Sequence, residues 1–399
     1  MIAGEYPWPE NSGSRMRLMT TVLALRELGP TELFSVVSRN RQDIEPPELV
    51  GGLTKVSHTT YDLDAGLPGA ALVRPWLPFA VPIRERPAVQ AALHSFVSGD
   101  YDLVWYFGLR AWLLAEASSA APAVLDLDDL EDYKIRARLS VPRPTAAPLA
   151  ARLKDWAAAR YSEEEARRWR RLRHRTAGEV RSLVVCSQLD ADRLGTQRSA
   201  RVFVVPNGYP QVDVPARNRA PDAPPVILFQ GTLRYPPNAD AARFLVDGIA
   251  PAIWALIPDA RIRLVGLTTP ALADLDDPPA VTLVGQVPDI GVELARADLV
   301  VVPVRFGSGT RVKIVEAFAH RIPVVSTTLG AEGLRAVDGE HLLIGDDPES
   351  VARACARLLT DEALRTRIVD AAYDLFLTHF RRDRAEDAVR AVARDAVGR

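Results

Sequence analysis

The sequence predicts an α/β protein made of two doubly wound domains, each a parallel β-sheet covered by helices. Three observations lead to this prediction. The chain has 399 residues, about twice the length of a typical domain. Short apolar runs alternate with helical patterns in both halves, and this alternation is typical of parallel sheets covered by helices. A proline-rich segment separates the halves, and its composition indicates a stiff, exposed linker.

The N-terminal half is expected to supply the first sheet. Short apolar runs predict buried strands at Thr31–Ser38, Leu103–Tyr106, Ala123–Leu127 and Leu183–Cys186. Amphipathic patterns predict helices at Met16–Leu28, at Val89–Val97 and from Leu149 to about Arg181. Ile2–Glu5 is the candidate first strand. It is hardly apolar, so this strand is either short or begins upstream of the sequence.

The proline-rich segment Pro206–Pro225 sets the domain boundaries, with a first domain at 1–208, a linker at 209–225 and a second domain at 226–375. Strands of the second domain are predicted at Val226–Phe229, Arg261–Val265, Val281–Val284, Leu299–Val302 and Pro323–Ser326. Its helices are predicted at Asp240–Ile257, Gly291–Ala297, Arg311–His320 and Pro348–Leu359. A charged, amphipathic helix is expected from about Ala363 to Val397, and its part within 376–399 is a candidate to cross back to the first domain.

Composition excludes several classes of protein. The formal net charge of −2 gives no drive toward nucleic acid. Cys186 and Cys355 lie far apart without the spacing of metal ligands, so two reduced thiols are the favoured interpretation. No run approaches the ~20 apolar residues of a membrane span, and the N-terminus lacks the regions of a signal peptide. The sequence predicts a soluble, cytoplasmic protein.

The predicted strand Leu299–Val302 leads into a segment suited to bind an anion. Gly307 and Gly309 flank Ser308 in a turn that brings backbone N–H groups close to a ligand. A helix then begins near Thr310 or Arg311, and a helix N-terminus favours phosphate. The chain has 49 basic residues, of which four are lysines, and one of these follows at Lys313.

Lys313 and Glu316 lie three residues apart on this helix, which leaves two interpretations open. In the first interpretation, the two side chains form an ion pair on the helix surface that contributes roughly a few tenths of a kcal/mol to the stability of the fold. Alternatively, Lys313 and Arg311 hold a diphosphate while the Glu316 carboxylate accepts hydrogen bonds from two hydroxyl groups of a sugar or ribose. Charge-assisted bonds of this kind contribute about 1.5–3 kcal/mol each.

The second half contains five informative segments over most of residues 226–380: FQGTLRYPPNADA (229–241), RLVG (263–266), LVGQVPDI (283–290), ADLVVVPVRFGSGTRVKIVEAFAHRIPVVST (297–327) and TLGAEGL (328–334). In their order and spacing these segments resemble glycosyltransferase family 4, whose members are retaining enzymes of the GT-B fold with two Rossmann-like domains facing a cleft. In the first half, PWPENSGSRMR resembles the first loop of the family, in which Gly13 approaches the donor phosphate.

The resemblance implies roles for individual residues in binding a nucleotide-sugar donor. Glu316 matches the glutamate that holds the ribose, and Lys313 matches the lysine that binds the diphosphate, with Arg234 or Arg311 as a second cation. The first glutamate of the family pair falls on Ser308, so backbone N–H groups of this turn are expected to replace it. The remaining expected donor contacts are Gly309 and Thr310 in this turn, Val287 and Pro288 at the nucleobase, and Gly330, Glu332 and Gly333 beside the sugar and phosphates.

The resemblance also implies a mechanism without a protein nucleophile, metal or cofactor. The leaving diphosphate takes the proton of the acceptor, and Lys313, Arg234 and Arg311 stabilise the charge that builds on the phosphate. The acceptor, whether a small molecule, a glycan or a lipid-linked group, stays open. Three alternatives also stay open: a nucleotide-sugar 2-epimerase, a pseudo-glycosyltransferase that joins a cyclitol, and a non-catalytic nucleotide-sugar binder.

Asp126-Leu127-Asp128-Asp129 follows a predicted strand and has more than one interpretation. Two carboxylates at this spacing can hold a divalent metal, Asp126 and Asp128 can orient an acceptor hydroxyl, or the carboxylates can act as helix caps in a solvated loop.

Two further features concern surfaces. The run SEEEARRWRRLRHR (162–175) predicts a solvated structural helix, and its basic part with Trp169 is alternatively a weak peripheral contact with the inner face of an anionic membrane. His320 lies in the donor helix, where we expect it to be exposed rather than catalytic.

Overall fold

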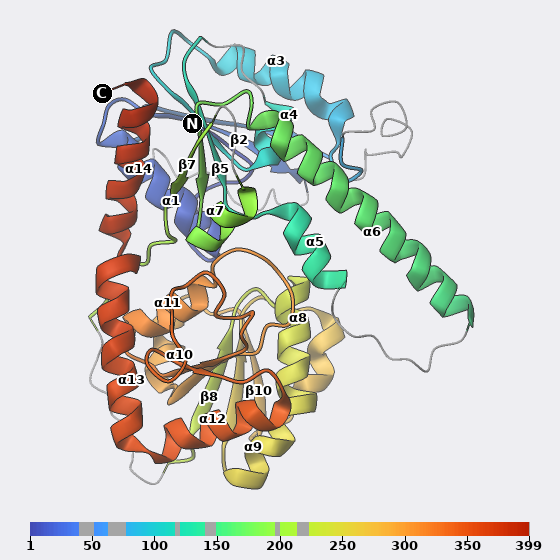
Figure 1. Cartoon of the computed structure of the whole chain (residues 1–399), viewed down its shortest axis with the longest axis vertical. Helices are drawn as coiled ribbons and strands as arrows, with labels where there is room; N and C mark the ends of the chain where they lie inside the picture. Colours follow the sequence, from blue (N-terminus) through green and yellow to red (C-terminus); the bar gives the residue numbers. More distant parts are fainter. Residues whose placement is uncertain are drawn as a thin grey trace. The chain divides into compact units, whose positions relative to one another are not determined.

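Each of two units folds around its own parallel β-sheet in the computed structural model of the chain (Figure 1). The structure describes residues 1–39, 52–62, 77–115, 120–139, 149–195, 200–213 and 223–398. Unit 1 comprises Met1–Pro206, Gly307–Gly309 and Ala385–Arg399. Unit 2 comprises Asn207–Phe306 and Thr310–Arg384.

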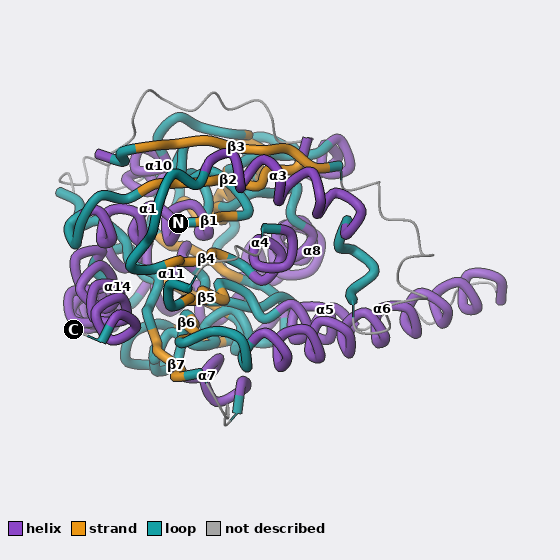
Figure 2. The backbone as a smooth tube through the Cα atoms, turned by 90° about the horizontal axis from the view of Figure 1, so that it is seen from above, coloured by secondary structure: helices purple, strands orange, loops and turns teal. Residues whose placement is uncertain are grey.

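Unit 1 contains a seven-stranded sheet with the order β3-β2-β1-β4-β5-β6-β7, and Figure 2 shows the strands side by side in this order. All of its strand pairs are parallel. The chain builds the sheet outward from β1 in one direction and then from β4 in the other, as in doubly wound folds. The strands are β1 (Ile2–Ala3), β2 (Glu32–Ser38), β3 (Lys55–Tyr61), β4 (Val104–Phe107), β5 (Ala123–Leu127), β6 (Ser182–Val185) and β7 (Arg201–Val204).

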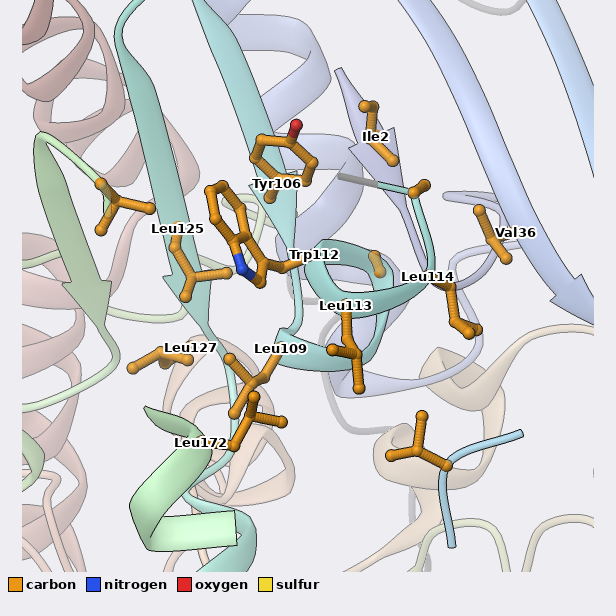
Figure 3. Close-up of a cluster of buried hydrophobic side chains, with 14 of the residues drawn as sticks. Ile2, Val36, Tyr106, Leu109, Trp112, Leu113, Leu114, Leu125, Leu127 and Leu172 are labelled. Atoms are coloured by element: carbon orange, nitrogen blue, oxygen red, sulfur yellow. The ribbon is translucent and has the colours of Figure 1, made fainter. Parts of the chain in front are cut away.

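Helices cover this sheet and fill its core with aromatic and aliphatic side chains. In the core, Trp112 packs edge to face on Tyr106 with ring centroids 4.7 Å apart, and Leu125 lies beside them (Figure 3). The helices of unit 1 are α1 (Gly13–Arg26), α3 (Arg86–Phe96), α4 (Leu109–Leu114), α5 (Glu131–Leu139), α6 (Leu149–Thr176) and α7 (Gln188–Leu194), with a 3₁₀ turn at Ile83–Glu85. The C-terminal helix α14 (Arg382–Val397) adds Val389 and Val392 to the core formed with Trp105 and Val124.

Unit 2 contains a six-stranded parallel sheet with the order β10-β9-β8-β11-β12-β13. Its strands are β8 (Val226–Gln230), β9 (Arg261–Val265), β10 (Val281–Gly285), β11 (Leu299–Val302), β12 (Val324–Ser326) and β13 (Leu343–Ile344). Its helical segments are α8 (Pro236–Arg243), a π-helical turn at Phe244–Ile249, α9 (Ala250–Leu256), a 3₁₀ segment at Pro270–Leu275, α10 (Ile290–Arg296), α11 (Val312–Ala319), α12 (Pro348–Thr360), α13 (Glu362–Leu375) and a π-helical turn at Phe376–Phe380. No helix among the described residues is both long and apolar enough to cross a membrane.

The sequence-based prediction of two parallel-sheet domains is confirmed, with three differences in detail. Strands β3 and β7 were not expected, because KVSHTTY and RVFV lie at the sheet edges and are only partly buried. The two-residue strand β13 is too short to stand out in a pattern. The predicted terminal helix is in fact two helices, since the backbone at Arg381 is extended.

The predicted exposed linker was wrong at its beginning. Asn207, Gly208 and Tyr209 are buried rather than exposed. The Tyr209 backbone N–H donates to the carbonyl of Phe380 at 2.8 Å, and the Arg382 N–H donates to the Tyr209 carbonyl at 2.9 Å. These bonds fix the segment against the C-terminal part of unit 2. Residues 214–222 of the predicted linker lie outside the described residues.

A buried ion pair joins α1 to β5 and to the residue that follows β7 in unit 1. The Arg17 guanidinium donates two hydrogen bonds to one oxygen of Asp126, at 3.0 and 2.8 Å, and a third to the Val205 carbonyl at 2.7 Å. Both side chains are at most 2% exposed. Burial raises the pKa of Asp126, and the Arg17 charge opposes this shift.

Replacement of Asp126 by alanine should destabilise unit 1 by about 3–5 kcal/mol, because it leaves the Arg17 charge buried without its partner. Urea unfolding followed by tryptophan fluorescence measures this, since six of the seven tryptophans belong to unit 1 and the seventh is Trp254. The control is Glu179→Ala, which removes the exposed pair with Arg175 and should cost less than about 1 kcal/mol. Equal stability of the two variants would contradict a structural role for the Arg17–Asp126 pair.

Candidate functional site

The predicted donor residues of unit 2 gather at one edge of its sheet. All six strands run parallel, so the loops that follow them lie at their carboxyl ends, which is where doubly wound folds bind ligands. Gly231 and Arg234 follow β8, and Val287 and Pro288 follow β10. Thr310, Arg311 and α11 follow β11, and Gly330 to Gly333 follow β12.

Glycines end three neighbouring strands at this edge, and each adopts a positive φ. The φ angles are 146° at Gly231, 135° at Gly266 and 80° at Gly285. A Cβ atom on Gly266 would lie 1.9 Å from the carbonyl oxygen of Gly231, so no other residue fits there. The edge therefore presents backbone to a ligand instead of side chains, as close approach to a diphosphate requires.

Lys313 points from the first turn of α11 to this glycine edge. Its Nζ donates to the Asn238 Oδ1 on α8 at 2.7 Å and lies 4.4 Å from the centre of the Phe229 ring on β8. A Cβ atom at Gly231 would come within 2.9 Å of the same Nζ. The absence of a side chain at residue 231 thus leaves the space that the ammonium group occupies.

The Lys313 ammonium group is held in an environment that disfavours its charge. Burial, and next the positive charge of Arg311, lower the pKa of Lys313 to about 7, against the opposing effect of Glu316. Among the described residues, no carboxylate forms an ion pair with Lys313. The surface-pair interpretation of Lys313 and Glu316 is therefore wrong. A buried ammonium without a carboxylate partner is suited to an anionic ligand.

Glu316 lies one turn further along α11 and accepts a hydrogen bond from the end of β8. The Gln230 Nε2 donates to its Oε2 at 3.3 Å. Burial raises the pKa of Glu316, while the neighbouring Gln230 amide, the Tyr209 hydroxyl and the Lys313 charge oppose this shift. The carboxylate can accept further hydroxyl groups.

The predicted second cations differ in their surroundings. Arg311 is the N-cap residue of α11 and is half-buried, and its effect on the pKa of Lys313 shows that the two charges interact. Arg234 is exposed, and its Nε donates to the Thr268 carbonyl at 2.9 Å in the loop after β9. Val287 is half-buried and Pro288 is exposed beyond β10.

The turn before α11 contains a buried hydroxyl group. Thr310 is 8% exposed, and its Oγ1 has no hydrogen-bond partner among the described residues. Ser308 and Gly309 group with unit 1, where the Ser308 hydroxyl donates to Asp129 at 3.0 Å and Gly309 has a φ of 77°.

The loop after β12 is fixed tightly at its start. Gly330 donates its N–H to the Thr327 Oγ1 at 2.9 Å, and a Cβ at this position would lie 2.3 Å from the Ser326 Oγ. Packing against the end of the strand therefore requires glycine here. Glu332 and Gly333 follow, both half-buried, and Gly333 has a φ of 80°.

The expected acceptor residues lie in unit 1 and are not equivalent. Asp126 is fully buried against Arg17, which leaves no surface for an acceptor or a metal, so both functional interpretations of Asp126 were wrong. Asp128 is half-buried beyond β5, and burial followed by the charge of Asp129 raises its pKa to about 7. Gly13 begins α1, which is capped by the Ser12 hydroxyl.

Two expectations about exposed side chains were wrong. His320 is 9% exposed and packs edge to face on Tyr209, with ring centroids 6.1 Å apart. Trp169 is 3% exposed, and its Nε1 donates to Glu165 at 3.1 Å. Trp169 is therefore a core residue of unit 1 and does not meet a membrane.

Sequence reasoning missed four residues that build this site: Tyr209, Gln230, Gly231 and Asn238. A signal was present for Gly231, because a glycine ends or follows each of three successive strands. Asn238 and Tyr209 lie 75 and 111 residues from the side chains that they contact, which are those of Lys313 and His320. No local pattern marks such partners.

Comparison with known proteins supports this description of the fold. Residues 224–361 match the model of a family described as glycosyl transferases group 1. No curated protein matches the sequence. The chain is similar in structure to the sucrose-phosphate synthase of Thermosynechococcus elongatus, with a TM-score of 0.65 and 18% identity over 99% of this chain and 95% of that one.

Two other structures that contain nucleotides are similar over nearly their whole length. An E. coli trehalose-6-phosphate protein bound with UDP-2-fluoro glucose has a TM-score of 0.65 and 14% identity over 99% of this chain and 98% of that one. Anabaena HepE in complex with UDP and glucose has a TM-score of 0.62 and 15% identity over 98% of each chain. The chain thus has the GT-B fold.

The Lys313 amine should titrate near neutral pH in the free protein. Because the chain contains only four lysines, competitive labelling with acetic anhydride and mass spectrometry can follow each amine separately. We expect the labelling of Lys313 to have a midpoint at about pH 7, with the exposed Lys154 as internal reference. Arg311→Gln removes a like charge and should move the midpoint upward. A midpoint for Lys313 near the usual lysine value of about 10.4 would contradict its burial.

Proposed function

We propose that this protein is a retaining glycosyltransferase that moves a sugar from a nucleoside-diphosphate sugar to an acceptor hydroxyl. The observation that carries the proposal is the buried Lys313 ammonium at a glycine-lined strand edge, one helical turn from a hydrogen-bonded carboxylate. The Lys313 cation and the exposed backbone of the glycine edge suit a diphosphate, and the Glu316 carboxylate suits the hydroxyl groups of a ribose attached to it. The match of residues 224–361 to glycosyl transferases group 1 and the nucleotides bound in the structural neighbours support it.

Each group has a role that follows from its surroundings. Lys313 binds the diphosphate, and because an anion favours the charged amine, donor binding takes up a proton near neutral pH. Glu316 accepts the ribose hydroxyls. The Thr310 hydroxyl and the backbone N–H groups at the start of α11 bind phosphate oxygens, with Arg311 or Arg234 as the second cation.

The chemical step consists of positioning and of charge stabilisation. As the bond from the sugar to the diphosphate breaks, negative charge grows on the leaving phosphate, and Lys313 and Arg311 stabilise it. The acceptor oxygen forms the new bond on the face that the phosphate leaves, and its proton passes to that phosphate. This step uses no protein nucleophile, metal or cofactor, and we assign to Asp128 of unit 1 the role of orienting the acceptor hydroxyl.

The site fits the transferase better than a 2-epimerase. A 2-epimerase needs an acid and a base at the sugar, whereas in unit 2 the Glu316 carboxylate is already bound by the Gln230 amide. A non-catalytic binder would use Lys313 for the diphosphate in the same way, so only an activity measurement separates it from the transferase. Time-resolved NMR with UDP-, GDP- and ADP-sugars separates the outcomes, because transfer releases nucleoside diphosphate, epimerisation changes the sugar, and a binder changes neither.

Replacement of Lys313 by alanine should lower turnover by about two to three orders of magnitude, since one preorganised charge at the leaving group is lost. The control is Arg367→Ala, which removes an exposed cation from α13 of the same unit and should leave turnover unchanged. Steady-state kinetics measure both variants after circular dichroism has established that they are folded. A folded Lys313→Ala variant with wild-type turnover would contradict the proposed role of Lys313 at the leaving phosphate.

Because Trp169 in the run 162–175 is buried, we propose a different surface, the N-terminal half of α6, for a weak contact with the inner face of an anionic membrane. Figure 2 shows α6 extending away from the sheet of unit 1. Leu153 and Trp156 on this half are 60% and 62% exposed. Exposed Arg152, Lys154 and Arg160 accompany them, and this mixture of apolar and basic side chains suits an anionic lipid surface.

The paired substitution of Leu153 and Trp156 by alanine should abolish flotation of the protein with phosphatidylglycerol vesicles at low salt, because their apolar area no longer enters the interface. Leu256→Ala, which removes an exposed leucine from unit 2, is the matched control and should still float. If the wild-type protein stays at the bottom of the gradient, the membrane contact is excluded.

A further inference from the structure

We propose that Asn238 is a positioning residue for the donor, whose neutral side-chain amide holds the Lys313 ammonium group at the glycine edge and leaves the positive charge of that group for a diphosphate. This inference rests on the proposed function, because that function gives Lys313 the task of binding the diphosphate. It goes beyond that function in making the absence of charge at residue 238 a requirement for donor binding.

The side-chain amide of Asn238 is held through both of its polar atoms. Asn238 lies in the first turn of α8, and its Nδ2 donates to the Thr232 carbonyl at 3.0 Å in the turn after β8. Its Oδ1 accepts from the Lys313 Nζ at 2.7 Å. Because the carbonyl can only accept and the ammonium group can only donate, one orientation of the amide satisfies both neighbours. The Asn238 oxygen is therefore fixed toward Lys313.

The contact between the amide and the amine depends on the glycine beside them. A Cβ atom on Gly231 would lie 2.9 Å from the Asn238 Nδ2 and 2.9 Å from the Lys313 Nζ. An ammonium group has three N–H donors, and among the described residues only Asn238 accepts a hydrogen bond from this one. Two donors of Lys313 are therefore available for phosphate oxygens.

The bond to Asn238 also holds Lys313 away from Glu316. The two side chains lie three residues apart on α11, a spacing at which an ion pair can form along a helix. The described part of the chain contains no such pair, and the amine is bonded to α8 instead. The amide thus places the amine without neutralising its charge.

A carboxylate at residue 238 would have the opposite effect on the donor. Aspartate has nearly the shape of asparagine, so one of its oxygens could still accept from Lys313. It would raise the pKa of the amine, because an opposite charge favours the ammonium form. It would also pair with the charge that the diphosphate needs, and a buried pair is costly to break. Asn238→Asp therefore separates the position of the amine from the availability of its charge.

The alternative is that Asn238 has a structural role only, in which its bond to the Thr232 carbonyl fastens α8 to the turn after β8. Asn238→Asp and Asn238→Ala both remove this bond, because neither side chain has a donor in place of Nδ2. The structural role therefore predicts equal effects of the two variants. The positioning role predicts that aspartate weakens diphosphate binding more than alanine does.

The test measures dissociation constants of UDP, GDP and ADP by calorimetry and continues with the tightest-binding nucleotide and its nucleoside, which is titrated by NMR. Asn238→Ala should weaken binding of the nucleotide about tenfold, because Lys313 is no longer held. Asn238→Asp should weaken it about a hundredfold, because the amine is paired with a buried carboxylate. Both variants should bind the nucleoside, which has no phosphate, within about twofold of the wild-type protein.

Competitive labelling of the free proteins shows whether residue 238 contacts the amine. Asn238→Asp should raise the labelling midpoint of Lys313 from about pH 7 by about one pH unit or more. An unchanged midpoint in this variant, once circular dichroism has established that it is folded, would overturn the positioning role. If Asn238→Asp does not fold, Asn238→Ala decides alone, because a structural role weakens nucleotide and nucleoside alike.

The control is Thr366→Glu, which adds a negative charge at an exposed position of α13 in the same unit and should keep the wild-type affinity and midpoint. If Asn238→Ala and Asn238→Asp weaken the nucleotide equally, or if they weaken the nucleoside as much, the positioning role of Asn238 is overturned and the donor site stands. If Lys313→Ala itself binds the nucleotide as tightly as the wild-type protein, the diphosphate contact in the proposed function fails.

Discussion

The close approach of backbone to backbone at the carboxyl edge of the unit 2 sheet is the constraint on which the site depends. Gly266 can approach Gly231 only because neither has a side chain, since a Cβ at Gly266 would lie 1.9 Å from the Gly231 oxygen. The positive φ at both positions turns the chain away from the sheet sooner than an L side chain allows. The space that results admits the Lys313 ammonium group from α11.

The two ionisable groups of α11 are kept apart, and this separation has a physical consequence. If Lys313 and Glu316 formed an ion pair, each would neutralise the other, and a ligand would have to break the pair. Instead Lys313 binds the neutral Asn238 amide and Glu316 accepts from the neutral Gln230 amide. Burial shifts both pKa values toward the uncharged forms. An anion beside Lys313 and hydroxyl donors beside Glu316 would therefore favour the charged forms of both groups.

The sequence predicted the site residues that lie within short motifs, but it missed contacts between residues that are far apart in the chain. Lys313, Glu316 and the glycines around them lie within short segments whose spacing is informative in itself. Asp126 shows the opposite case, because nothing in Asp-Leu-Asp-Asp indicates that Arg17, 109 residues earlier, buries the first carboxylate. A carboxylate after a strand can bind a ligand only if no basic side chain of the protein already pairs with it. Whether such a pair forms depends on the tertiary structure.

Tyr209 illustrates the same limit in a segment of low sequence complexity. Proline and polar residues around it predict an exposed linker, and this prediction considers only the local chain. The parallel pairing with Arg381 supplies backbone hydrogen-bond partners that an exposed linker lacks. The beginning of the connection is therefore part of unit 2. Once the backbone is fixed, the aromatic ring is close enough to the His320 ring at the C-terminal end of α11 to be buried. The Tyr209 side chain and the end of this helix are therefore packed against each other. No prediction from the local chain finds this contact, because 111 positions separate the two residues in the sequence.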